Sequence, residues 1–155
     1  MFFLLGYAIF LFFTGATIML LKGDIFNFID LVSLLIILLP LVGILTATQS
    51  FKVFGAGFKA AILPKAPMSE DMRGRAASLF RFLSKSTALI AAIMFIISFR
   101  NILTGVDFLD PYAVARIPVN FSTALIVPSY GMILIAAVFE PIVFILKKRQ
   151  EKERK

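Results

Sequence analysis

Four stretches of the chain consist almost entirely of apolar residues, and each is long enough to cross a bilayer as a helix. They cover residues 1–21, 31–49, 86–103 and 119–146. A helix needs about 20 mostly apolar residues to cross roughly 30 Å of hydrocarbon. The pattern therefore predicts an all-α integral membrane protein, with four transmembrane helices in a single membrane domain.

None of these stretches carries an ionisable side chain near its middle. Inside a membrane, charged residues usually mark ion pathways. If the protein moves ions, we therefore expect the ion-binding acid to come from another chain.

Residues 50–85 form a short polar segment between the second and third stretches. Its first part, residues 51–63, alternates lysine with apolar residues, which predicts a helix lying at the membrane surface. Ser69, followed by Glu70 and Asp71, has the pattern of a helix start. Apolar residues then recur at helical spacing, so we expect one helix to run unbroken from here into the third stretch.

The composition supports a membrane protein and leaves little room for an enzyme. Hydrophobic residues make up 60% of the 155 residues, and soluble domains contain about 45–50%. Cysteine and histidine are both absent, which excludes disulfides, cysteine-ligated metals and the common histidine sites for zinc and haem. The sequence shows no nucleophile–base pair and no phosphate-binding glycine loop, so we expect no catalysis, no metal and no cofactor.

The net charge of +7 reflects an uneven distribution of basic residues. Thirteen of the 16 lysines and arginines lie in residues 50–85 or in the basic tail, residues 147–155. Cytoplasmic loops of membrane proteins are enriched in lysine and arginine. This rule explains the charge better than nucleic-acid binding, and it predicts that the loop, the tail and both termini are cytoplasmic.

Small and polar residues form lines along the last two stretches, if both are regular α-helices. On the fourth, Ser122, Ser129 and Glu140 lie nearly on one line, beside Thr123 and Tyr130; Thr87 and Ser98 share a face of the third. In one interpretation these faces line a polar path or form a socket for a partner helix. In the other they are ordinary contacts between packed helices. Glu140 is either a proton relay or a structural partner of a nearby lysine.

Two segments resemble the MotA flagellar stator subunits. Residues 23–37, GDIFNFIDLVSLLII, are similar to the second-span signature of that family and include Asp30 and Ser33. Residues 124–131, ALIVPSYG, resemble its fourth-span motif and end at Gly131. The following Phe-Glu-Pro-Ile, with Pro141, is similar to the family's exit from the membrane.

The resemblance implies a ring of five copies in the bacterial inner membrane, as in the wider group of MotA, TolQ and ExbB proteins. The ring would surround single-span partner helices of the MotB or ExbD kind, each carrying a membrane aspartate, and ion flow would drive a flagellar motor or another machine. The polar residues of the third and fourth spans would then line the ion pathway or hold the partner helix. These residues are Thr87, Ser98, Ser122, Thr123, Ser129, Tyr130 and Glu140.

Departures from the family pattern keep two alternatives open. The cytoplasmic part is small, Val127-Pro128 replaces a threonine pair, and no proline begins the third span. These differences favour a non-conducting membrane scaffold that retains the stator fold. A small stand-alone transporter is the other alternative, because Pro40 and Pro128 could break helices.

Overall fold

The longest element of the protein is the helix α4 (Glu70–Thr104). The computed structural model describes residues 2–20, 30–63 and 66–153, which form helices and turns without a strand. The side chain of Ser69 caps α4 by accepting a hydrogen bond from the Met72 amide at 3.3 Å. With 35 residues, α4 is about 52 Å long. The predicted cap, and the unbroken helix into the third apolar stretch, are both confirmed.

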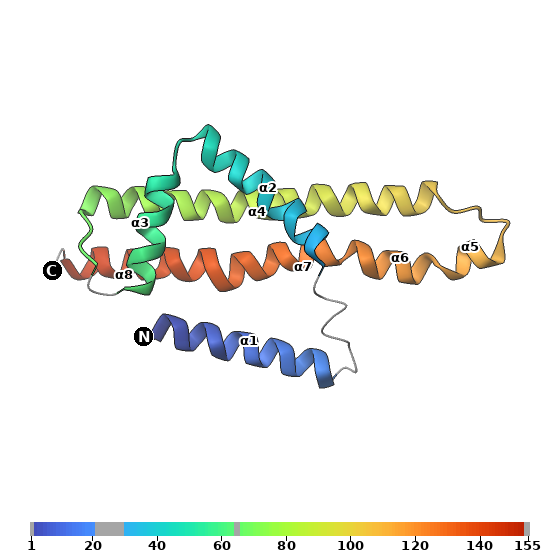
Figure 1. The fold of residues 1–155 in the computed structure, drawn as a ribbon, viewed down its shortest axis with the longest axis horizontal. Coiled ribbons are helices and arrows are strands. Elements are labelled where there is room, and N and C mark those ends of the chain that lie inside the picture. The colour runs from blue at the N-terminus through green and yellow to red at the C-terminus, as the bar shows by residue number, and fades with distance from the viewer. Residues whose placement is uncertain (1, 21–29, 64–65, 154–155) are drawn as a thin grey trace.

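A second long rod runs back along α4 to form a hairpin (Figure 1). Two prolines explain why this rod is segmented. A proline ring clashes with the carbonyl four residues earlier; for Pro128 this is Ala124, where α6 ends, and for Pro141 it is Ala137, inside a π-helical segment. The segments are α5 (Pro111–Ala115), α6 (Ile117–Ala124), α7 (Ile126–Ile133), the π-helix η2 (Leu134–Phe139) and α8 (Glu140–Glu153).

Two shorter helices cover the part of the hairpin nearer the C-terminus. The helix α2 (Leu31–Ala47) contacts α4 and α7, and α3 (Phe51–Ile62) lies across α4 and α8 (Figure 1). A bend of 116° separates α2 from α3. The first helix, α1 (Phe2–Leu20), contacts α3.

The core lies where α3 meets the hairpin. Phe80 of α4 is fully buried; its ring centroid lies 5.1 Å from that of Phe54 on α3 and 6.1 Å from that of Phe139 on the returning rod. Leu83 and Ile142 are also buried here. Aromatic stacking at these distances adds to the burial of the rings, so this cluster fixes α3 against both arms of the hairpin.

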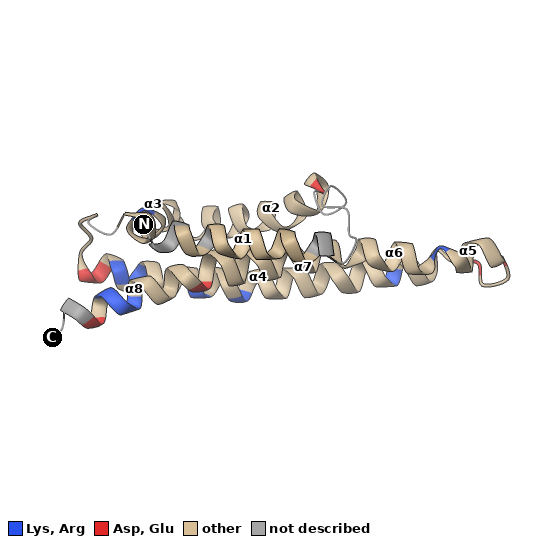
Figure 2. Cartoon of the chain, turned by 90° about the horizontal axis from the view of Figure 1, so that it is seen from below, with Lys and Arg blue, Asp and Glu red and all other residues tan. Residues whose placement is uncertain are grey.

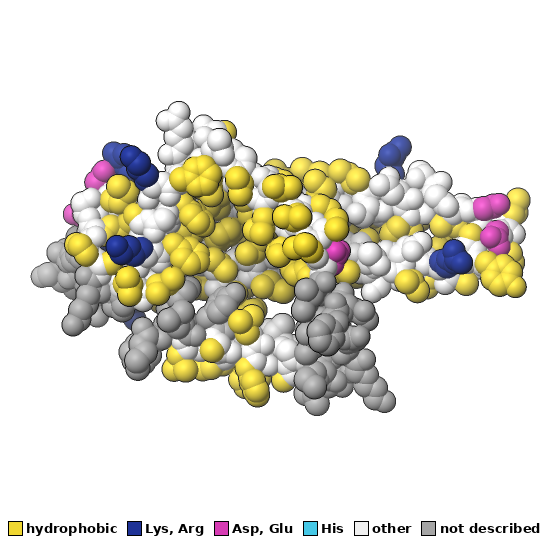
Figure 3. Space-filling view, in the orientation of Figure 1, with side chains coloured by type: hydrophobic (Ala, Val, Ile, Leu, Met, Phe, Trp, Pro, Cys, Tyr) yellow, Lys and Arg dark blue, Asp and Glu magenta, His cyan; other side chains and the backbone are white. Residues whose placement is uncertain are grey.

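The exposed surface is that of a membrane protein. Large apolar side chains cover much of the middle of the molecule in Figure 3, and most of the charged side chains in this view lie toward its two ends. Figure 2 shows most of the lysines and arginines at the end formed by α8 and the start of α4. A soluble monomer rarely exposes such large apolar patches, so the central band suits contact with lipid.

The structure supports fewer membrane spans than the four predicted. Within the described residues, two helical stretches are long and apolar enough to cross a membrane, Glu70–Thr104 and Pro111–Glu151, and α2 with α3 gives a third if the bent pair counts as one. The predicted second span, residues 31–49, corresponds to α2 alone, which ends at Ala47. The first predicted span, residues 1–21, corresponds to α1, whose 19 residues run from Phe2 to Leu20; residues 1 and 21 lie outside the description.

Candidate functional site

The two arms of the hairpin pack closely where Gly131 of α7 faces α4. A Cβ atom added at Gly131 would lie 2.9 Å from the Cβ of Ala91 and 3.6 Å from the Cγ2 of Thr87. Glycine and alanine at such crossings let membrane helices pack with their backbones close together. Gly131, predicted as a motif residue, is therefore a packing position.

An open apolar groove lies beside this contact, between α4 and the opposite rod. We call it the α4–α7 groove; its cavity volume is about 370 Å³. Three alanines and Phe95 form its α4 side, and its lining contains no charged or hydroxyl-bearing side chain. The lining residues are Ala88, Ala91, Ala92, Phe95, Leu125, Pro128, Gly131, Met132 and Ile135.

The chemistry of the α4–α7 groove suits a helix and not a reaction. Small side chains leave room for the larger side chains of another apolar helix, and close packing is a main source of helix association in lipid. Ala88 and Ala92 are exposed, while Ala91 beneath them is buried. Nothing in the lining could transfer a proton or hold an ion.

Three of the predicted pathway hydroxyls bond to their own helices. Thr87, which is fully buried, donates to the Leu83 carbonyl at 2.8 Å. Ser129 donates to the Leu125 carbonyl at 2.8 Å, and Thr123 to the Val119 carbonyl at 3.1 Å. Such bonds are the usual way in which a membrane helix satisfies a hydroxyl. Of the predicted pathway and motif residues, Gly131 alone lines the α4–α7 groove; Pro128, noted as a departure from the family pattern, lines it as well.

The predicted polar line along the fourth stretch assumed a regular α-helix, and the rod is not regular. Between Ser129 and Glu140 lies the π-helix η2. A π turn contains an additional residue, and one residue is about 100° of α-helical rotation. The line from Ser122 and Ser129 therefore does not continue straight to Glu140. Ser122 is exposed, and Ser98 on α4 is half-buried.

Glu140 makes a contact with α4 that the sequence did not indicate. Its Oε1 accepts a hydrogen bond of 2.8 Å from the hydroxyl of Ser84, a buried residue of α4, although Glu140 itself is exposed. Pro141 follows directly and is half-buried. The structure thus places the carboxylate at the seam of the two arms, with one hydrogen-bond donor.

Asp30, Ser33 and Tyr130 come together at the start of α2. The Asp30 amide donates to the Tyr130 hydroxyl at 2.8 Å, and the Asp30 carboxylate accepts from the Val32 amide at 3.0 Å and from the Ser33 hydroxyl. The bond from Ser33 is the main reason that the pKa of Asp30 is lowered, with the Val32 and Ser33 amides acting in the same direction and desolvation opposing them. This cluster joins α2 to α7.

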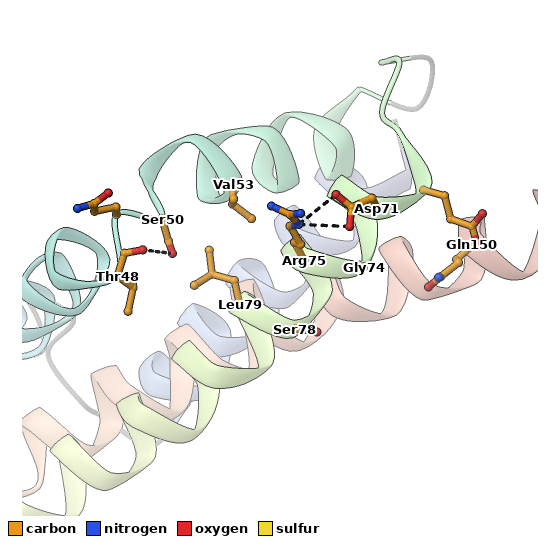
Figure 4. A pocket seen from close by; sticks show the side chains of 11 residues that line it. Thr48, Ser50, Val53, Asp71, Gly74, Arg75, Ser78, Leu79 and Gln150 are labelled. Carbon is orange, nitrogen blue, oxygen red and sulfur yellow. Dashed lines mark hydrogen bonds and ion pairs between the residues drawn. The ribbon is translucent and has the colours of Figure 1, made fainter.

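A second, larger cavity lies elsewhere, near the turn between α2 and α3 (Figure 4). It is open and polar, with a volume of about 1000 Å³. Asp71 and Arg75 form an exposed ion pair in its wall, at 3.0 Å, which contributes little to stability. The wall consists of Thr48, Gln49, Ser50, Val53, Glu70, Asp71, Gly74, Arg75, Ser78, Leu79 and Gln150.

Over the part of the chain that the structure describes, no three acidic side chains lie close enough to hold a metal ion. Comparison with known proteins finds no matching family model and no matching curated protein. The function proposed below therefore rests on the geometry of the α4–α7 groove.

Proposed function

We propose that this chain is the membrane subunit of an ion-driven stator complex of the MotA and ExbB kind. It would form a ring, of five copies, around single-span partner helices that carry the protonatable aspartate. The observation that supports this most directly is the α4–α7 groove, an open apolar groove on the helical hairpin with small residues on both sides. Small residues at a helix surface let another helix approach closely in lipid, which favours association.

Glu140 has a natural place in this proposal. A proton released from a partner helix needs an acceptor between the apolar middle of the ring and the cytoplasm. Glu140 lies near the basic end of the hairpin and is both exposed and hydrogen-bonded to Ser84. We infer that it forms the cytoplasmic mouth of the pathway.

A flux measurement tests the proposal. The chain is purified from its native membranes together with any bound single-span protein, reconstituted into liposomes, and assayed for proton uptake under an applied potential. We expect proton flux from the complex and little flux from the chain alone. The Glu140→Gln variant of the complex should show a large reduction in flux. The mass of the same complex should correspond to several copies of this chain; a monomer would contradict the ring.

A non-conducting scaffold is the second candidate, and one observation favours it. The hydroxyls of Thr87, Thr123 and Ser129 are committed to their own helices, and the α4–α7 groove is apolar throughout. A ring of the expected mass without flux above background would support the scaffold. Ser129→Leu separates the two further, because it should abolish flux in a channel and leave a scaffold assembled and functional.

A further inference from the structure

The helix α3 is placed to lie along the membrane surface. It begins at Phe51, directly after α2, and the chain turns by 116° between the two helices. If α2 crosses the bilayer, a helix bent by this angle runs roughly parallel to the bilayer plane. The depth also fits: α3 packs on Phe80, shortly before Lys85, where the uncharged stretch of α4 begins.

The inner face of α3 consists of small residues that fit tightly on the hairpin. Gly57, Ala60 and Ala61 are buried. A Cβ atom at Gly57 would lie 2.6 Å from the Cε2 of Phe80 and 3.1 Å from the Cβ of Ala76. Because this face is fixed against α4, the opposite face has a defined direction away from the protein.

The outer face of α3 combines two lysines with apolar residues. Lys52 and Lys59 are exposed, and their spacing of two helical turns places them on one side, about 10 Å apart. Phe51 and Leu63 flank them and are each 50% exposed. The helix contains no acidic residue. Lysines beside exposed apolar residues are typical of helices that lie in the headgroup region of anionic membranes.

We propose that α3 is a membrane-surface helix that binds anionic phospholipid headgroups through Lys52 and Lys59. Phe51 and Leu63 would enter the boundary between headgroups and acyl chains. The negative surface of the leaflet complements the two lysines, and the exposed Arg81 and Lys85 of α4 add positive charge nearby. The proposal requires a membrane position for the chain and does not depend on whether the chain belongs to an ion-driven complex.

A fluorescent label on α3 tests this proposal. The chain has no cysteine, so Gly55→Cys gives one labelling site, at a position where an added Cβ meets no atom within 4 Å. The full-length protein is placed in nanodiscs of phosphatidylcholine alone or with phosphatidylglycerol, together with a lipid carrying a quencher on its headgroup. We expect quenching to increase with phosphatidylglycerol and the effect to weaken at high salt.

Two double variants in the labelled protein identify the residues responsible. The double variant Lys52→Gln with Lys59→Gln should need a higher fraction of phosphatidylglycerol for half-maximal quenching. The increase should be about fivefold for each lysine removed. Lys147→Gln with Lys148→Gln removes the same charge from α8 and should leave the response unchanged. Equal quenching in both lipids, absence of quenching, or an unaltered response in the α3 variant would each overturn the proposal.

Discussion

At the scale of single residues, Gly131 is a position where the hairpin leaves no room for a larger side chain. Alanine has the higher helix propensity, so Gly→Ala at an unhindered helical site should stabilise by about 0.5–1 kcal/mol. At Gly131 the new methyl group would lie 2.9 Å from the Cβ of Ala91. We expect Gly131→Ala to lower the free energy of unfolding by about 1–2 kcal/mol, because overpacking forces the helices apart.

A matched control is available on α2. At Gly43 an added Cβ meets no atom within 4 Å, so Gly43→Ala should be neutral or stabilising. Thermal unfolding in one detergent compares the two variants. If both substitutions raise the melting temperature, the close contact between Gly131 and Ala91 is not present in the folded protein.

The environment of Asp30 predicts how the stability of the protein depends on pH in acid. Hydrogen bonds, led by the one from Ser33, lower its pKa in the folded protein, so folding favours the ionised carboxylate. The stability that this group contributes is complete above the ordinary aspartate pKa of about 3.9 and is lost as the pH falls through the lower, folded value. The difference in melting temperature between wild type and Asp30→Asn should therefore be constant near neutral pH and shrink in acid. A difference that grows on acidification would contradict this assignment.

Side-chain partners were the least predictable feature of the sequence. A stripe of hydroxyls has the same spacing whether its members face a pathway or bond to their own helix, and Thr87 and Ser129 do the latter. The bond between Asp30 and Tyr130 joins residues far apart in the chain. It depends on how α2 crosses α7, which no local pattern encodes.

At the scale of elements, local signals predicted helices well and their interruptions poorly. The cap at Ser69 and the apolar periodicity after it were sufficient to predict α4. The π-helix η2 was missed, although Pro141 provides a retrospective signal, since the ring clashes with a carbonyl inside η2. The sequence predicted that a surface helix follows the second span, but not the angle of 116° between α2 and α3. Gln49, at the bend, has a positive φ of 50°, which no local pattern indicated.

The α4–α7 groove yields a prediction at this scale. Ala92→Leu would fill space between the two helices with a branched side chain, without disturbing the buried Ala91 contact. We expect the variant to fold and to lose most of its association, with copies or partner helices, as measured by the mass of the detergent-solubilised complex. Ala47→Leu, at an exposed position at the end of α2, adds the same volume away from the groove and should assemble normally.

An unchanged mass in Ala92→Leu would show that assembly uses another face of the molecule. A variant that no longer unfolds cooperatively would instead point to a disturbed hairpin. Thermal unfolding therefore accompanies the mass measurement, and the two results together separate a lost interface from a lost fold.

At the scale of the whole molecule, the order of charges and apolar surface gives a direction to the hairpin. Basic residues gather at the end with α8 and the start of α4, and the turn between α4 and α5 forms the far end (Figures 1 and 2). A broad apolar band lies between them (Figure 3). By the positive-inside rule, we expect the basic end to face the cytoplasm. The turn, where Leu109 is 93% exposed, should then lie outside.

Single cysteines can test this orientation, because the natural chain has none. In intact cells, a membrane-impermeant maleimide should label Leu109→Cys. It should label Lys148→Cys only after the cells have been permeabilised. Leu89→Cys is the informative control: Leu89 is 63% exposed in the isolated chain, but lies within the uncharged part of α4. Bilayer contact should leave that thiol protonated and unlabelled in both conditions, because the thiolate is the reactive form. Rapid labelling at residue 89 would mean that this face of α4 is in contact with water. The face would then line a water-filled pathway and would not contact lipid.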